Sequence, residues 1–350
     1  MHTKLHGIFV FSVAVLILAV SCAEEAQQPV AVDPAVLPAF GVIANVMESP
    51  DNPVTPGKVA LGRMLYFEKR LSKSQEISCN TCHPLDQYGA EAKRVSEGHK
   101  GQRGNRNAPT VLNAAAHVAQ FWDGRARTVE EQAKGPILNP VEMAMPSEED
   151  VIAVLQSIQE YRDAFKAAFP SEQNPVTIDN MAKAIGAFER TLATPSRWDR
   201  FLEGDSAALT NEEKAGFNKF TEVGCMACHS GPLVGATMFQ KLGIQKPWPV
   251  TSDLGRFTVT HEETDRMAFK VPSLRNVEKT GPYYHDGSVA TLEAAVKDMG
   301  EYQLGRILKN QEVGEIVSWL KALSGQIPAG ITGPLQLPPS SAATAKPDPS

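Results

Sequence analysis

The chain has 350 residues, which is enough for two domains with hydrophobic cores of their own. Its formal net charge of −6 argues against nucleic acid as a partner, because proteins that bind nucleic acid gather positive charge. Cysteine is scarce, and four of the five cysteines fall in two short motifs, so the chemistry of the chain is best sought there.

The N-terminal segment 1–23 has the pattern of an export signal. Lys4 and His6 give a weakly basic start, and the apolar run Ile8–Val20 is too short to span a bilayer comfortably. Small residues follow, so we expect cleavage after Ala23; alternatively, Cys22 is the lipidated first residue of a lipoprotein. Both alternatives predict a periplasmic protein, either free or anchored to the membrane through Cys22.

Two C-x-x-C-H pentapeptides are each the attachment signature of a c-type haem. Two thiols three residues apart reach both vinyl groups of one porphyrin, and the histidine that follows is the proximal iron ligand. These residues are Cys79, Cys82 and His83 in the first motif and Cys225, Cys228 and His229 in the second. A four-cysteine zinc site explains neither histidine, and a redox dithiol needs a single C-x-x-C near a βαβ pattern. We therefore predict two covalent haems, which suit the exported compartment.

An internal repeat organises the rest of the chain. Three pairs of segments lie the same 163 positions apart: Pro109–Asn113 with Pro272–Asn276, Asp123-Gly124 with Asp286-Gly287, and Thr128–Glu130 with Thr291–Glu293. The haem motifs are only 146 positions apart, so the second copy carries an insertion, 17 positions long, within Ser230–Lys270. A constant offset over three separate matches predicts two copies of one unit.

Apolar residues at helical spacing predict mostly helices. The stripes cover 151–169 and 178–192, Thr210 caps a helix that runs into Cys225, and 311–323 forms a closing helix. We see no convincing run of alternating residues that would predict strands.

We therefore expect an all-α fold of two cytochrome c-like domains, each with one haem. The N-terminal domain covers 24–194 and the C-terminal domain 195–327, with a linker near Thr194–Ser206, where Pro195 and Gly204 break helices. The stretch 328–350 is rich in Pro, Ala and Ser and is expected to be a poorly ordered tail.

The sixth ligand of each iron separates an electron carrier from a catalyst. For the second haem the candidates are Met238, Met267, Met299, His261 and His285. Most methionines in helical proteins only fill the core. Met299 is favoured because it comes late in its unit, far along the chain from the proximal His229, as in a class I cytochrome c.

For the first haem the candidate is His99, which follows soon after His83 in the chain. It lies in the glycine-rich, charged segment Glu97–Gly104, which predicts a mobile loop from which a ligand can be withdrawn. A solvated surface histidine is the open alternative.

Two further side chains stand out in the first unit. Trp122 corresponds to His285 in the repeat, and it is either a core anchor or a π-system between the haems. Glu142 lies among apolar residues and prolines. If it is buried, its pKa is raised, as suits a general acid–base group for peroxide; an exposed loop glutamate is the alternative.

With these residues in view, the chain resembles the bacterial di-haem cytochrome c peroxidases from about Thr55 to Leu323. Besides the two haem motifs, the resemblance is carried by Gly98-His99, Arg106–Thr110, Phe121–Arg125, Glu131–Ala133, Val141–Met143, Phe269–Pro272, Tyr284–Gly287, Met299 and Gln303–Gly305. It implies reduction of hydrogen peroxide to water with electrons from a small cytochrome c or copper protein.

The resemblance also implies roles for individual residues. Electrons enter at a high-potential C-terminal haem with His229 and Met299 as axial ligands, and reduction there releases His99 from the low-potential N-terminal haem. Glu142 and Gln132 match residues that handle peroxide, and Trp122 matches a tryptophan between the haems. Asn107, with the carbonyls of Thr280 and Pro282, matches a calcium site. The members of this family form homodimers.

Two other functions remain as alternatives. A pure di-haem electron carrier, with both irons permanently six-coordinate, gives Glu142 and the His99 loop no purpose. A di-haem enzyme that oxidises tryptophans in a precursor protein is similar, but those relatives carry a tyrosine where this chain has Met299.

Overall fold

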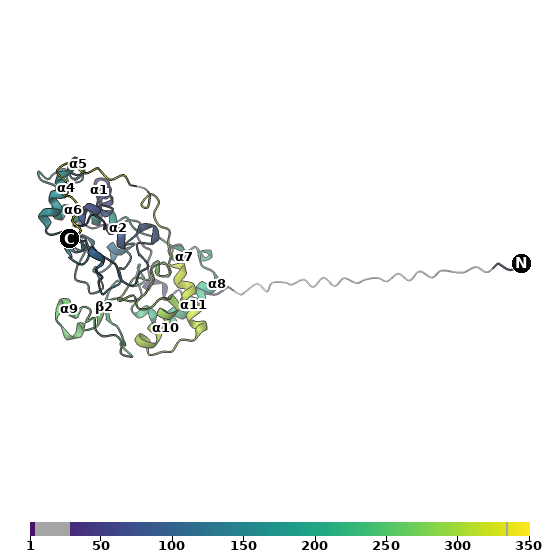
Figure 1. The fold of residues 1–350 in the computed structure, drawn as a ribbon. Helices are drawn as coiled ribbons and strands as arrows, with labels where there is room; N and C mark the ends of the chain where they lie inside the picture. The colour runs from purple at the N-terminus through teal and green to yellow at the C-terminus, as the bar shows by residue number, and fades with distance from the viewer. Residues whose placement is uncertain (4–28, 334) are drawn as a thin grey trace.

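The computed structural model describes residues 1–3, 29–333 and 335–350. Most of the predicted export signal, Cys22 included, lies outside the described residues. Among the described helices none is both long and apolar enough to cross a bilayer. Figure 1 shows α1, α4, α5 and α6 gathered at one side of the molecule and α7, α8, α10 and α11 at the other.

The N-terminal half is built on five helices: α1 (Pro56–Tyr66), α3 (Val129–Leu138), α4 (Glu148–Ser157), α5 (Gln159–Ala168) and α6 (Ile178–Glu189). α1 packs closely on α6, because Gly62 has no side chain where a Cβ would overlap the carbonyl of Ala184. The apolar stripe predicted over 151–169 is two helices, since Ile158 takes an extended conformation between them.

The C-terminal half is held by α7 (Arg197–Leu202), α8 (Asn211–Glu222), α10 (Leu292–Asp298) and α11 (Asn310–Ala322), with the short α9 (Phe257–Thr260) outside this core. The glycine at 216 lets α8 approach the main chain of α11. Three aromatic rings fill the space between: the centroid of Trp198 is 4.8 Å from that of Phe217 and 5.4 Å from that of Trp319.

The segment expected to be a linker, Thr194–Ser206, is part of this core. It contains α7, whose Trp198 is completely buried. Pro195 and Gly204 flank the helix instead of excluding one, and six residues are too few to give a clear helical period.

Strands are few among the described residues. β1 (Phe239–Lys241) pairs antiparallel with β2 (Ala268–Lys270), with Gln240 opposite Phe269. This two-stranded ribbon corrects the all-α expectation in detail. The sequence did not predict it, because three-residue strands are too short to show alternation. Both strands lie within Ser230–Lys270, the span in which the insertion is predicted.

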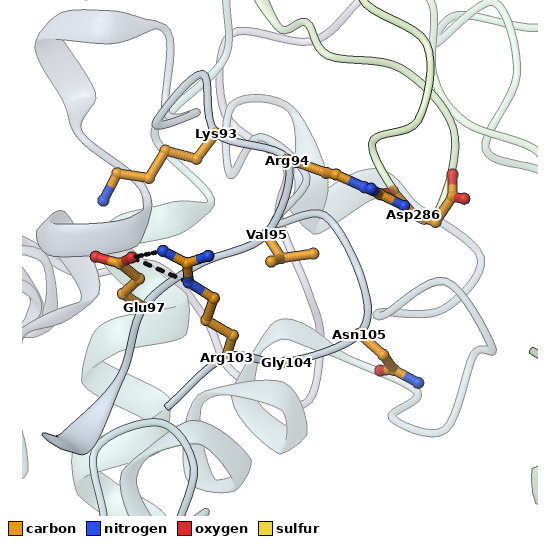
Figure 2. A pocket seen from close by; sticks show the side chains of 8 residues that line it. All are labelled: Lys93, Arg94, Val95, Glu97, Arg103, Gly104, Asn105 and Asp286. Carbon is orange, nitrogen blue, oxygen red and sulfur yellow. Dashed lines mark hydrogen bonds and ion pairs between the residues drawn. The ribbon is translucent and has the colours of Figure 1, made fainter. Parts of the chain in front are cut away.

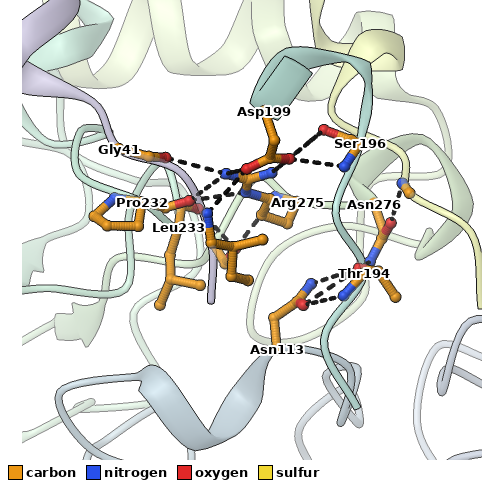
Figure 3. A network of polar contacts seen from close by, with 12 residues as sticks. Gly41, Asn113, Thr194, Ser196, Asp199, Pro232, Leu233, Arg275 and Asn276 are labelled. Carbon is orange, nitrogen blue, oxygen red and sulfur yellow. Dashed lines mark hydrogen bonds and ion pairs between the residues drawn. The ribbon is translucent and has the colours of Figure 1, made fainter. Parts of the chain in front are cut away.

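A buried polar network joins α7 to loops of the C-terminal half (Figure 3). Arg275 and Asp199 form an ion pair in which both side chains are almost inaccessible, and Arg275 Nη2 is 2.8 Å from Asp199 Oδ1. Arg275 Nε also donates to Pro232 O at 2.8 Å, and Asp199 Oδ1 accepts from the Ile43 amide at 2.9 Å. The pair is therefore hydrogen-bonded on both sides, as a buried ion pair must be.

The stretch 328–350 differs from the poorly ordered tail expected from its composition. Its described residues return along the N-terminal half, and the C-terminus lies near α4 and α6 (Figure 1). Arg63 Nη2 donates to Gly333 O at 3.0 Å, and Arg70 Nη2 donates to Pro338 O at 2.8 Å. Polar contacts to main-chain oxygens hold this segment, so a low apolar content does not prevent it from packing.

Candidate haem sites and the region between them

The first C-x-x-C-H motif forms one helical turn, α2 (Cys79–Cys82). The turn is capped because the Ser78 amide donates to Thr81 Oγ1 at 3.0 Å. The carbonyl of His83 accepts from the Tyr66 hydroxyl at 2.6 Å, which fixes the histidine that follows the turn. Burial lowers the pKa of His83, and the neutral imidazole is the form that binds a metal.

The second motif continues from α8 through Gly224, which has φ 101° and turns the chain into Cys225–Ala227. Burial lowers the pKa of His229 to about 4. Gly235, at φ 128°, lies against this imidazole, because a Cβ there would be 3.1 Å from His229 Nδ1 and would overlap Pro272 O. The histidine is thus held neutral in a site that admits no larger residue beside it.

Both sites fit a covalent haem. Cys79, Cys82, Cys225 and Cys228 are free and partly accessible, so no disulfide competes for their thiols. Burial raises the pKa of Cys79 and of Cys225 to about 12, which keeps these thiols protonated. Each pair of thiols is followed by one buried imidazole, His83 or His229. A porphyrin bound at each turn would use this donor set.

His99 lies directly against the segment that carries Glu142. The His99 amide donates to Glu142 O at 2.8 Å, and a Cβ at Gly98 would overlap Val141 O. His99 is only 5% exposed, which does not agree with a solvated surface histidine. The structure therefore brings together two residues that are far apart in the sequence.

Glu142 is partly buried, and burial raises the pKa of its carboxyl. Asn139 Nδ2 donates to Glu142 Oε1 at 2.8 Å, which orients the carboxyl group and partly offsets the cost of burial. Gln132 lies on α3, the helix that ends one residue before Asn139, and is partly exposed. A carboxyl group of this kind can take up and return a proton.

A polar cleft of about 630 Å³ opens beside the His99 loop (Figure 2). Its lining comes from Lys93, Arg94, Val95, Glu97, Arg103, Gly104, Asn105 and Asp286. Arg103 Nε donates to Glu97 Oε1 at 3.0 Å, and Arg94 Nε donates to Asp286 O at 3.2 Å. The cleft is thus shared between the loop of the first half and a residue of the second.

Trp122 and Met299 pack on the same apolar cluster. Its buried members are Leu242, Trp248, Met267, Phe269 and Tyr284. Trp122 is fixed from two sides, because its Nε1 donates to Asn107 O at 2.9 Å and its carbonyl accepts from the Lys270 amide at 2.8 Å. Met299 begins a π-helical turn, Met299–Gln303, at the end of α10. Such turns are frequent at functional sites.

The other candidates for the sixth ligand of the second haem lie in less suitable positions than Met299. His261 is exposed, and His285 stacks on Phe269 with ring centroids 4.1 Å apart. Met267 is buried in the cluster, whereas Met238 is not one of its members. Met267 therefore remains the nearest competitor of Met299 on position alone.

The residues of the expected calcium site come from two segments that touch. The backbone amide of Asn107 donates to His285 O at 2.7 Å, and His285 follows Pro282 by three residues. The side-chain Nδ2 of Asn107 donates to Lys93 O at 2.9 Å. No group of three or more His, Cys, Asp or Glu in the described part of the chain is arranged to hold a metal ion. The ligands expected for calcium, Asn107 and the carbonyls of Thr280 and Pro282, do not belong to these four residue types.

Sequence reasoning missed a charged network beside Trp122. Lys270 is buried, and its Nζ lies 2.8 Å from Ala119 O and 3.1 Å from His117 Nδ1. Burial lowers the pKa of Lys270 to about 7. Nearby, Arg106 Nε is 2.7 Å from Asp253 Oδ2, within the span Ser230–Lys270 that contains the predicted insertion. Phe269–Pro272 and Arg106–Thr110 are among the segments that carry the resemblance, but nothing in the sequence indicated the partners of Lys270 and Arg106.

Two helical turns with paired thiols, each followed by a buried neutral imidazole in a helix-rich chain, are the features of a c-type di-haem protein. A family model described as "Di-haem cytochrome c peroxidase" matches residues 56–207. The cytochrome c551 peroxidase of Nitrosomonas europaea is 50% identical over 292 residues, covering 81% of this chain and 86% of the relative. That of Pseudomonas aeruginosa is 45% identical over 307 residues, covering 86% and 88%.

Among solved structures, a MauG-like protein associated with microbial copper homeostasis superposes with a TM-score of 0.74 at 29% identity, covering 83% of this chain and 96% of that one. The present chain belongs to the di-haem cytochrome c peroxidase family, whose enzymes are oxidoreductases that act on peroxide.

Proposed function

We propose that this protein reduces hydrogen peroxide to water in the periplasm, with electrons from a small cytochrome c or copper protein. The observation that carries the proposal is the buried contact between the His99 loop and the Glu142 segment. A removable cap and a proton-transfer group then share one site. The relatives named for cytochrome c551 support a small cytochrome as donor.

The two-domain organisation, 24–194 and 195–327, is part of this proposal, and repeated backbone geometry supports it. At the spacing of the repeated segments, the isolated bridge Gln120–Ala126 has its counterpart in Tyr283–Val289. At the spacing of the haem motifs, the Gly89 amide bonds to Pro84 O at 2.9 Å, and the Gly235 amide bonds to Ser230 O at 2.8 Å. Side-chain identity has been lost at several of these positions, while the turns have kept their form.

We place electron entry at the second motif, where His229 and Met299 would hold the iron. A thioether sulfur favours the ferrous state and raises the potential. The cluster that contacts Met299 also contacts Trp122, so Trp122 lies on a packed path toward the first half.

Peroxide is assigned to the first motif, where His83 would hold the iron. His99 would leave this iron when the second haem of the same chain is reduced. When bound, this haem supplies the iron at which the peroxide bond is reduced. The Glu142 carboxylate takes a proton from peroxide and returns it to the departing oxygen, with Asn139 holding the carboxyl group in place. Gln132 is proposed to assist from α3.

The remaining features of the proposal concern assembly. Calcium would bind Asn107 and the carbonyls of Thr280 and Pro282, joining segments of the two halves through oxygen ligands that calcium prefers. The enzyme would work as a homodimer. Lipidation of Cys22 would anchor it to the membrane without changing the site.

The test is the spin state of the first haem, measured by EPR in oxidised and half-reduced protein, together with peroxide turnover. His99→Gly should leave the first haem high-spin even when oxidised, and active without prior reduction. His261→Gly is the matched control, because this histidine is exposed and lies at φ 61°, where glycine is tolerated. A His99→Gly protein that still required reduction would refute the gating.

The two alternatives give different outcomes in the same assay. A pure electron carrier would take up one electron per haem from its donor and then stop, without consuming peroxide. An enzyme that oxidises tryptophans in a precursor protein would consume peroxide without a cytochrome donor.

A further inference from the structure

The C-terminal segment Ser341–Ser350 forms a strap across the N-terminal half, with the C-terminus near α4 and α6 (Figure 1). Gln75 Nε2 donates to Ala345 O at 2.8 Å, and the hydroxyls of Ser157 and Thr344 are 2.7 Å apart. Almost every residue of the strap is exposed, so side-chain hydrogen bonds and one ion pair attach the strap in place of apolar burial. A segment attached in this way opens at low cost.

Lys73 is the main attachment point. Its Nζ donates to Ser350 O at 2.9 Å and lies 3.4 Å from Asp348 Oδ2, while its carbonyl accepts from the Asp348 amide at 2.9 Å. The Lys73 amide in turn donates to Met143 O at 2.9 Å. The strap is therefore tied to the residue that follows Glu142.

The end of the strap also meets His99. The distance from His99 Nε2 to Ser350 O is 3.3 Å. A main-chain oxygen can only accept a hydrogen bond, so Nε2 must carry the proton in this contact. In the neutral imidazole Nδ1 then holds the lone pair. His99 Nδ1 is buried and has no hydrogen-bond partner among the described residues.

We propose that the strap is a positioning element for His99, which holds the imidazole in the tautomer whose free Nδ1 can cap the first haem iron. Metal-binding histidines commonly donate their second ring N–H to a carbonyl in this way, which fixes ring orientation and strengthens the ligand. Release of the strap would favour departure of His99 and open the first site. The inference rests on the proposed function, in which His99 is a removable cap.

The first experiment removes the segment 341–350 from the otherwise intact protein loaded with both haems. The deletion leaves the contacts of Arg70 to Pro338 and Ser340 in place. In the oxidised state we expect the ratio of high-spin to low-spin first haem, measured by EPR, to rise by about tenfold, the effect of losing an outer-shell partner of a ligand. Cyanide should bind the oxidised protein faster by a similar factor.

A point variant tests the same proposal if the deletion disturbs folding. Lys73→Met removes the side-chain contacts to Ser350 and Asp348 and should shift the spin state in the same direction. Lys346→Met is the matched control, since it removes the same charge from an exposed lysine of the strap that makes no side-chain hydrogen bond or ion pair among the described residues. It should behave as the unmodified protein does.

Unchanged spin populations in both the deletion and Lys73→Met would overturn the strap proposal, and so would an equal shift in Lys346→Met. Failure of the proposed function looks different. In that case the unmodified protein would show no change in the first haem between the oxidised and half-reduced states, whatever the strap variants do in the oxidised state.

Discussion

Asn113 and Asn276, which are equivalent positions of the internal repeat, donate their side-chain amides to one hydroxyl oxygen, Thr194 Oγ1, at 2.9 and 2.8 Å (Figure 3). Both asparagines have positive φ, 63° and 60°. Thr194 is completely buried, so the two repeat-related turns converge on a single residue between the halves. Its hydroxyl satisfies both turns at once.

Thr194→Val should therefore be costly although it conserves volume. The substitution leaves two buried amide donors without their acceptor, and each unsatisfied group costs about 1–3 kcal/mol. We expect the free energy of unfolding to fall by about 2–4 kcal/mol, measured by denaturant titration. Thr191→Val is the control, because this hydroxyl serves only the Phe188 carbonyl of the preceding helix. Equal losses in both variants would show that the shared acceptor is unimportant.

The buried pair of Asp199 and Arg275 predicts sensitivity to acid. Burial alone would raise the pKa of Asp199, but hydrogen bonds and the charge of Arg275 outweigh it and lower the pKa below its usual range. Because the folded pKa lies below the unfolded one, the stabilisation is fully present above about pH 4 and is lost as pH falls through the folded pKa.

Asp199→Asn should reduce the free energy of unfolding at pH 7 by about 3 kcal/mol or more, since Arg275 keeps its charge in a buried site. The difference from the unmodified protein should narrow as pH falls below about 4. Asp163→Asn, at an exposed position on α5, should change little at any pH. A difference for Asp199→Asn that stays constant with pH would contradict the assignment to the ion pair.

Met299→His tests the ligand of the second haem against its nearest competitor. Replacing sulfur by imidazole should lower the midpoint potential of that haem by on the order of 0.1 V or more, and should slow electron supply to the first. Met267→Leu is the matched change, because Met267 is buried in the same cluster. Redox titration followed by visible spectroscopy distinguishes them. A fall in potential only in Met267→Leu would reassign the ligand.

Local patterns in the sequence were sufficient for the helical regions of α4 to α6, α8 and α11 and for the two thiol turns, because each depends on neighbouring residues. The strap and α7 were missed for opposite reasons. Lys73 and Gln75 bind main-chain oxygens of the strap, which leave no signature in the strap's own side chains, whereas α7 has a strong anchor in Trp198 but is too short to show a period. The closeness of His99 to Glu142 depends on folding, and only the resemblance to known peroxidases had paired them.

Lys270 marks the limit of such reasoning. A lysine at the end of a short strand would normally be assigned to solvent, yet its ammonium is buried against Ala119 O and His117. The acceptors come from a loop in the other half of the chain, and pairing of that kind requires the fold.

Glu142→Gln should remove the acid–base group while keeping the shape of the site. We expect peroxide turnover to fall by about 10²–10⁴-fold, with little change in the potential of either haem. The pH profile gives a second readout. Burial raises the pKa of Glu142, and the carboxylate is the active form, so turnover in the unmodified protein should rise with pH through a value above the usual 4.5.

That acid limb should be absent in Glu142→Gln, because an amide does not titrate. Glu148→Gln, at an exposed position in the first turn of α4, is the control and should keep both rate and profile. An acid limb that persists in Glu142→Gln would assign the titration to another group. If Glu142→Gln retained its turnover, Glu142 would not be the acid–base group, and another group would transfer the proton at the site that His99 gates.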